Sequence, residues 1–171
     1  MAATVDIREK NTAGETPTIK TSGTLRFKKA DNSTVDINNP LVKPVAGNDR
    51  SYEKVLRLFI GVTGPTGQIE NLNFYSDGSN NMGTGISLFV RTTNPGTFTT
   101  PAIPANDSAG TSVFTYNSGS KKDADAVNTG PFTGTSIDIG DYLYLWMTID
   151  NTVAGPGVTG SETLSISFDE S

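Results

Sequence analysis

The sequence predicts an all-β fold, an antiparallel β-sandwich most compatible with a jelly roll, preceded by an extended N-terminal arm. Apolar and polar residues alternate with period two in run after run. Turn-forming residues separate these runs, with 18 Gly and 9 Pro among 171 residues. No stretch of ten residues has the 3.6-residue period of a helix. A chain of this length is typical of one domain.

Residues 1–22 contain one weak strand at residues 4–9, followed by a polar stretch rich in Thr, Pro and Gly. This pattern predicts an arm over residues 1–22 that a neighbouring copy would order. The sandwich domain is then expected over residues 23–171. Deleting residues 2–22 should, on this interpretation, weaken assembly without unfolding the sandwich.

Alternation places the remaining strands in order along the chain. Strands are predicted at residues 24–29, 35–37, 52–62, 69–75, 86–91, 113–116, 136–139, 142–149 and 163–168. Residues 52–62 and 142–149 are apolar on both faces, so both should be central. The turn GPTG indicates that residues 52–62 and 69–75 form a hairpin. Two long segments, 92–111 and 117–135, fit the long connections of a jelly roll.

Missing residue types exclude several kinds of chemistry. The chain has no Cys and no His, so it has no disulfides, no His or Cys metal site and no Ser-His-Asp triad. The net charge of −5 argues against non-specific nucleic-acid binding. No segment approaches 18 apolar residues, and the N-terminus lacks the pattern of a signal peptide. We therefore expect synthesis in a cytoplasm, with no nucleic-acid partner, no membrane and no cofactor.

Charge is distributed unevenly along the chain. Residues 1–91 hold 11 basic and 9 acidic residues, whereas residues 92–171 hold 2 basic and 9 acidic residues. The basic cluster of Arg26, Lys28 and Lys29 is either the solvated face of a strand or a docking patch for an acidic partner. Together with Lys121 and Lys122, it is the candidate contact with another subunit or with a larger assembly.

Three aromatic residues, Tyr142, Tyr144 and Trp146, share one face of a predicted central strand. They are a candidate aromatic interface. The stripe is either a second buried face, a subunit contact or a platform on which a sugar would stack.

Oxygen-rich and carboxylate residues offer only weak candidates for metal binding or catalysis. The loop SDGSNNMG, with Asp77, is either a turn or a calcium loop, and the turn is favoured because the loop lacks the alternating acids of an EF-hand. Glu53 and Glu70 could serve a carboxylate glycosidase on neighbouring strands, but both positions should face solvent. Asp123 and Asp125 are expected to be solvated. We predict no enzymatic activity and no metal site.

Four segments carry a resemblance to a known group of proteins. They are SYEKVLRLFI, NLNFYSDGSNNMGTGISLFVRTT, DYLYLWMTID and ETLSISFDES. In their order and in their pattern of residues, these segments resemble small virion proteins of tailed bacteriophages. The resemblance implies a non-enzymatic decoration (cement) protein on the capsid exterior, bound to the major capsid protein as a homotrimer. A tail or fibre component and a carbohydrate-binding module are the alternatives.

Overall fold

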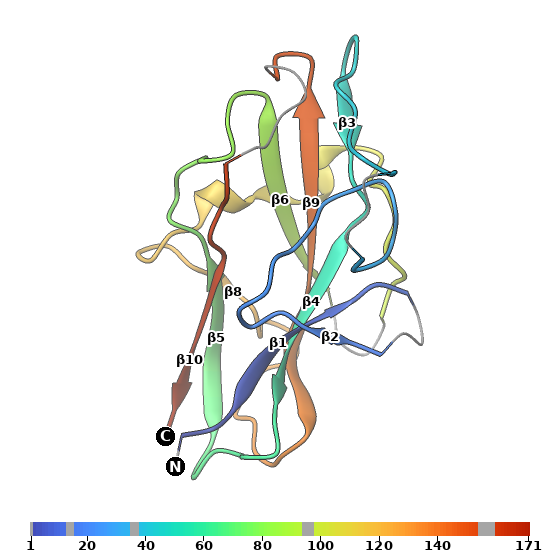
Figure 1. Cartoon of the computed structure of the whole chain (residues 1–171). Helices are drawn as coiled ribbons and strands as arrows, with labels where there is room; N and C mark the ends of the chain where they lie inside the picture. Colours follow the sequence, from blue (N-terminus) through green and yellow to red (C-terminus); the bar gives the residue numbers. More distant parts are fainter. Residues whose placement is uncertain (1, 13–15, 35–37, 94–97, 154–159) are drawn as a thin grey trace.

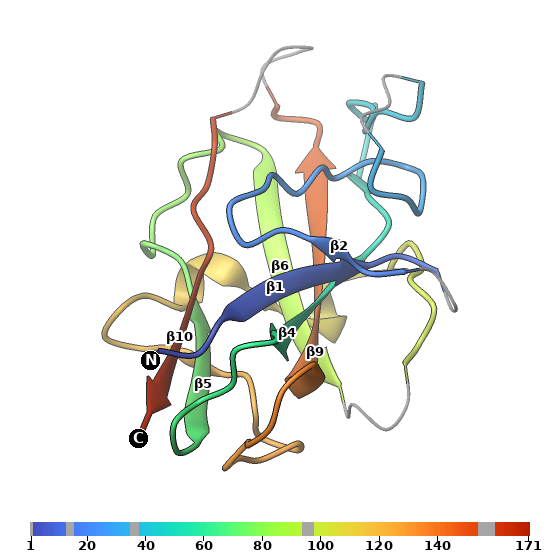
Figure 2. The same ribbon diagram turned by 60° about the horizontal axis from the view of Figure 1, so that its bottom comes forward.

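The computed structural model describes residues 2–12, 16–34, 38–93, 98–153 and 160–171. Within these residues, two antiparallel sheets pack face to face around one apolar core (Figures 1 and 2). The predicted all-β sandwich is therefore confirmed at the level of two packed antiparallel sheets.

The larger sheet has the strand order β2-β1-β4-β9-β6-β7, and β3 also pairs with β9. Both strands predicted to be central, β4 and β9, lie in the middle of this order. The strands of this sheet are β1 (Val5–Lys10), β2 (Thr18–Ile19), β3 (Asn48–Arg50), β4 (Lys54–Ile60), β6 (Ile86–Thr93), β7 (Thr111–Ser112) and β9 (Ile137–Asp150).

The smaller sheet has the order β10-β5-β8. Its strands are β5 (Ile69–Tyr75), β8 (Lys122–Asp123) and β10 (Ser165–Glu170). Two short 3₁₀ turns, η1 (Asp107–Ala109) and η2 (Val113–Thr115), flank β7. The N-terminal and C-terminal ends lie side by side (Figure 1), because the Glu170 carboxylate accepts the amide N–H of Ala3 at 3.0 and 3.1 Å.

The core lies between the two sheets and follows the alternation in the sequence. Every second residue of β4, β6 and β9 points inward. Its fully or nearly fully buried members include Leu58, Ile60, Ile69, Leu72, Phe74, Leu88, Val90, Ile139, Leu143 and Leu145.

Residues 136–139 and 142–149, predicted as two strands, belong to one strand, β9. The break in alternation between them is a bulge, since Leu56 pairs with Leu143 but Leu58 pairs with Ile139. Gly140 lies in this bulge with φ +68, a conformation that glycine adopts without strain. The bulge changes the register so that both halves of β9 still direct apolar residues into the core.

The predicted hairpin between residues 52–62 and 69–75 is not formed. β4 belongs to the large sheet and β5 to the small sheet, so the GPTG turn crosses from one layer to the other. The strand order likewise does not confirm a jelly roll, because β1, β4, β9 and β6 lie adjacent in one sheet.

Two short predicted strands have other conformations. Residues 24–29 form no strand, although Leu25 and Phe27 pack against the core. Residues 113–116 contain the 3₁₀ turn η2 in place of a strand. The strand predicted at residues 35–37 lies outside the described residues.

The structure does not confirm an extended arm over residues 1–22. β1 pairs with β4 over six residues, from Val5 opposite Ile60 to Lys10 opposite Val55. Val5 and Ile7 pack against the core, and Glu9 is buried at 1% exposure. This segment is therefore part of the large sheet in a single chain.

Candidate functional site

The outer face of the large sheet, turned away from the small sheet, holds the aromatic stripe predicted from the sequence. Tyr142, Tyr144 and Trp146 are 7%, 0% and 0% exposed. Residues 98–110, here called the covering loop, pack over them. The stripe is thus buried by the chain's own loop, which removes the exposed aromatic surface on which sugar stacking depends.

Both ends of the covering loop are attached to the stripe. Tyr144 donates its hydroxyl to the carbonyl of Thr99 and accepts the amide of Thr99, both at 2.9 Å. Phe98 meets the Tyr142 ring edge-on, with centroids 5.6 Å apart. At the other end, Gly110 lies so close to the Trp146 ring that a Cβ there would collide with it. These contacts hold the loop flat against the sheet.

Asp107, in the covering loop, accepts the hydrogen bonds that connect this loop to the sheet. Its carboxylate accepts hydrogen bonds from Arg50 at 2.8 and 2.9 Å, from Thr148 at 2.7 Å and from Trp146 Nε1 at 3.1 Å. Burial alone would raise the pKa of Asp107, but these donors lower it to about 2. The carboxylate therefore remains charged and keeps the loop attached across the ordinary pH range.

A second carboxylate, that of Glu53, anchors the middle of the covering loop. Glu53 is 4% exposed and receives Arg91 Nη2 at 2.7 Å. Its amide donates to the carbonyl of Ala102 at 3.0 Å. A shallow hollow of about 650 Å³ lies between this pair and loop residues such as Ile103 and Pro104. The prediction that Glu53 faces solvent is therefore wrong, because its carboxylate is buried in an ion pair with Arg91.

In the part of the chain that the structure describes, four basic side chains on the outer face each lie over an aromatic ring. Arg8 lies 3.2 Å from the Phe59 centroid, Lys10 4.4 Å from Phe98, Arg57 4.8 Å from Tyr142, and Arg91 4.2 Å from Tyr144. Cation–π contacts of this kind hold long basic side chains flat and half-desolvated. This face is therefore basic and aromatic on a chain whose net charge is −5.

Three apolar side chains are exposed in two loops, the segment before β3 and the covering loop. Val42 and Val45 are 63% and 99% exposed, and Ile103 is 39% exposed. Asn48 donates to Asp107 at 3.2 Å and Arg50 donates to the Ala105 carbonyl at 3.3 Å, which joins the two loops. We call these three side chains the apolar loop end.

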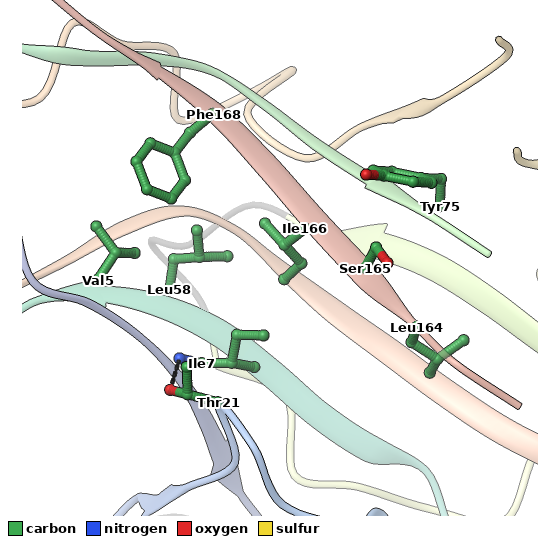
Figure 3. Close-up of a pocket in the computed structure, with 9 residues that line it drawn as sticks. All are labelled: Val5, Ile7, Thr21, Leu58, Tyr75, Leu164, Ser165, Ile166 and Phe168. Atoms are coloured by element: carbon green, nitrogen blue, oxygen red, sulfur yellow. Dashed lines mark hydrogen bonds between the residues drawn. The ribbon is translucent and has the colours of Figure 1, made fainter. Parts of the chain in front are cut away.

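A groove of about 340 Å³ opens between β1 and β10, where the two sheets diverge (Figure 3). Apolar side chains from both sheets line it, among them Ile7 and Leu58 on one side and Ile166 and Phe168 on the other. Thr21 lies at its edge and accepts the amide of Ile7 at 3.0 Å.

The structure separates the basic residues that were grouped as one candidate contact. Lys28 is buried at 3% exposure and donates to the Thr34 carbonyl, whereas Lys29 forms an ion pair with Asp49. Arg26 is exposed. Lys121 and Lys122 lie at β8, on the small sheet, over the rings of Tyr75 and Tyr116. Both candidate lysines of the first cluster thus have partners within the chain.

The loop with Asp77 has the contacts of a turn. Its carboxylate accepts the Ser79 amide at 2.7 Å and the Asn81 side chain at 2.8 Å, and Gly78 has φ +85. Within the described residues, no three Asp or Glu side chains gather as metal ligands. Glu53 directly precedes β4 of the large sheet, whereas Glu70 lies in β5 of the small sheet.

Asp125 should make stability depend on pH. Burial first, and then the hydrogen bond and charge of Asp123, raise the pKa of Asp125 from 3.8 to about 6. A raised folded-state pKa contributes stability that is complete below about 4 and lost as the pH rises through about 6. We expect the urea midpoint of Asp125→Asn to change less than that of wild type between pH 4 and pH 7. Equal changes in both proteins would contradict this.

The burial of Trp146 predicts its fluorescence. As the chain's one tryptophan, with 0% exposure, it should emit at shorter wavelength than free tryptophan. Its emission should stay unchanged when soluble polysaccharides are titrated in, since the ring cannot reach a sugar. A saturable shift with one polysaccharide would favour the carbohydrate-binding alternative.

Sequence reasoning missed the residues that build this face. Arg8, Arg57 and Arg91 lie in three different strands, so no local motif links them. The sequence feature that these arginines share is a polar position in a strand where apolar and polar residues alternate. No sequence pattern predicts the hydrogen bonds of Asp107, because its partners Arg50 and Trp146 are far from it in the sequence.

No protein-family model, curated protein or solved structure matches the chain. Among the described residues, no helix is long and apolar enough to cross a membrane.

Proposed function

We propose that this protein is a non-enzymatic structural component of a phage virion, which decorates and stabilises the capsid exterior. The observation that carries the proposal is the apolar loop end. Val42 and Val45, three residues apart in one loop, leave most of their apolar surface in water, and exposed apolar patches mark protein–protein contact sites.

The rest of the outer face supports a role in protein contacts. It combines arginines with aromatic rings, and interfaces are enriched in both residue types. The covering loop is held by Asp107 and Glu53, so little ordering of this loop would be needed on binding. The proposed partners are the major capsid protein, at the apolar loop end, and further copies of the chain in a homotrimer.

Location in the virion tests the proposal. An antibody raised against the purified protein should place gold label around the heads of virions purified from the phage that encodes it. Label on tails would favour the tail or fibre alternative. Virions without label, and without the chain in their mass spectrum, would overturn both.

The apolar loop end can be tested by substitution. Val45→Asp combined with Ile103→Asp should weaken binding to purified heads that lack the protein by about tenfold or more, because it places charge in an apolar contact. Val62→Asp is the matched control, since Val62 is 86% exposed at another turn and should leave binding unchanged. Equal binding by all three proteins would remove the loop end from the contact.

A further inference from the structure

We infer that two copies of the chain associate head to tail, with the outer face of the large sheet of one copy against the outer face of the small sheet of the next. The inference deepens the proposed function by naming the self-contact, and it rests on that function for its biological role. The contact itself is argued from two pairs of like charges, one on each face.

The first pair lies on the large sheet. Arg8 of β1 is directly opposite Arg57 of β4 in the sheet register. Side chains at paired positions share a face, and like charges placed there destabilise the sheet. Arg57 donates Nε to the Gly140 carbonyl at 3.2 Å, and its one ion pair among the described residues is a long contact with Asp138, at 3.7 Å. Within the described residues, neither Arg8 nor its outer-face neighbour Lys10 forms an ion pair.

Burial makes this basic pair a stronger attractor for an anion. Arg8 lies against the Phe59 ring, and its Nε is buried without a hydrogen-bond partner. A half-desolvated guanidinium interacts with a carboxylate more strongly than one in bulk water does. An incoming carboxylate would therefore relieve repulsion between Arg8 and Arg57 as well as form a new ion pair.

The second pair is its acidic counterpart on the small sheet. Glu70 of β5 is directly opposite Asp169 of β10 in the register. Each accepts an amide side chain, Glu70 from Gln68 at 3.5 Å and Asp169 from Asn71 at 2.8 Å. In the part of the chain that the structure describes, neither forms an ion pair with a cation. Lys121 lies toward the other end of β5, over Tyr75 and bonded to Ser167.

A second copy of this chain is a partner that would give both pairs of like charges opposite charges at the same contact. The outer faces of a sandwich point in opposite directions, so a contact between them is heterologous. Such a contact closes into a ring when each step includes a suitable rotation, and otherwise extends as a chain. Because the two faces point in opposite directions, this contact joins copies into an open chain and is separate from the contact that would close the proposed homotrimer.

Charge reversal on each face tests the contact by sedimentation at low salt, with no phage particle present. Wild type should show a mass that rises with concentration, and added salt should lower that mass. Arg8→Glu with Lys10→Glu should weaken self-association by about tenfold or more, and so should Glu70→Lys with Asp169→Lys. An equimolar mixture of the two variants should associate again, because each now carries the complement of the other.

The controls separate this contact from general charge effects and from the proposed function. Arg26→Glu with Lys43→Glu makes the same change in net charge at exposed positions and should sediment like wild type. Near-ultraviolet circular dichroism of Trp146 checks that each variant is folded. Wild type that stays monomeric at every concentration, or a variant mixture that does not associate, would overturn the inference. Binding to heads could still occur, so the two failures are distinguishable.

Discussion

Removal of residues 2–22 is expected to unfold the domain, because β1 is an integral strand of the large sheet. Its six paired residues cover one side of β4. Val5 and Ile7 contribute apolar surface to the core. Each such side chain, when fully buried, adds about 1.5–3 kcal/mol, and a domain has only about 5–15 kcal/mol in total.

The ion pair at the end of β1 increases this effect. Lys54 is 0% exposed, and its Nζ lies 3.1 Å from Glu9 Oε1. The same ammonium donates to the Asn32 carbonyl at 2.7 Å and to Asn11 at 3.2 Å. Truncation removes Glu9 and Asn11 together, and loss of one partner of a buried ion pair costs about 3–5 kcal/mol.

Urea unfolding followed by Trp146 fluorescence measures the result. The truncated chain should show no cooperative transition. Glu9→Gln, which keeps the strand but removes the charge, should retain a transition with a clearly lower midpoint. A truncated chain with the wild-type midpoint would show that residues 2–22 are a dispensable arm.

Trp146→Ala is expected to lower the free energy of unfolding by about 3–5 kcal/mol, the range for large aromatic residues in a core. The ring stacks on Phe89 with centroids 5.6 Å apart and supports the covering loop at Gly110. Its loss leaves a cavity beneath the loop and removes one donor to Asp107.

Trp146→Phe separates packing from hydrogen bonding. It keeps a ring against Phe89 but removes the Nε1 donor, so it should cost less than the Ala variant. Chemical denaturation of both variants, followed by far-ultraviolet circular dichroism, gives the comparison. Equal losses in the two variants would mean that the hydrogen bond to Asp107, and not packing, holds the loop.

Strand positions were largely predictable from the sequence because alternation is a local property. Residues 69–75 match β5, and residues 86–91 and 163–168 overlap β6 and β10. Alternation failed where side chains pack on the core without a sheet partner. Leu25 and Phe27 do so from a segment that forms no strand.

The arrangement of strands and the outer face could not be predicted in the same way. The turn after β4 has the residues of a hairpin, but its composition does not say in which sheet the next strand lies. The stripe with Trp146 was correctly placed on one face of β9. That it is covered depends on Asp107 and Gly110, which are about 40 residues earlier in the chain.

Electron cryomicroscopy of the intact virion tests the central claim most directly. We predict density for the two-sheet sandwich on the capsid exterior, with the apolar loop end of Val42, Val45 and Ile103 against the major capsid protein. Neighbouring copies should meet with Arg8 and Arg57 facing Glu70 and Asp169. A sandwich located only in the tail, or a virion map without it, would contradict the proposed role in capsid decoration.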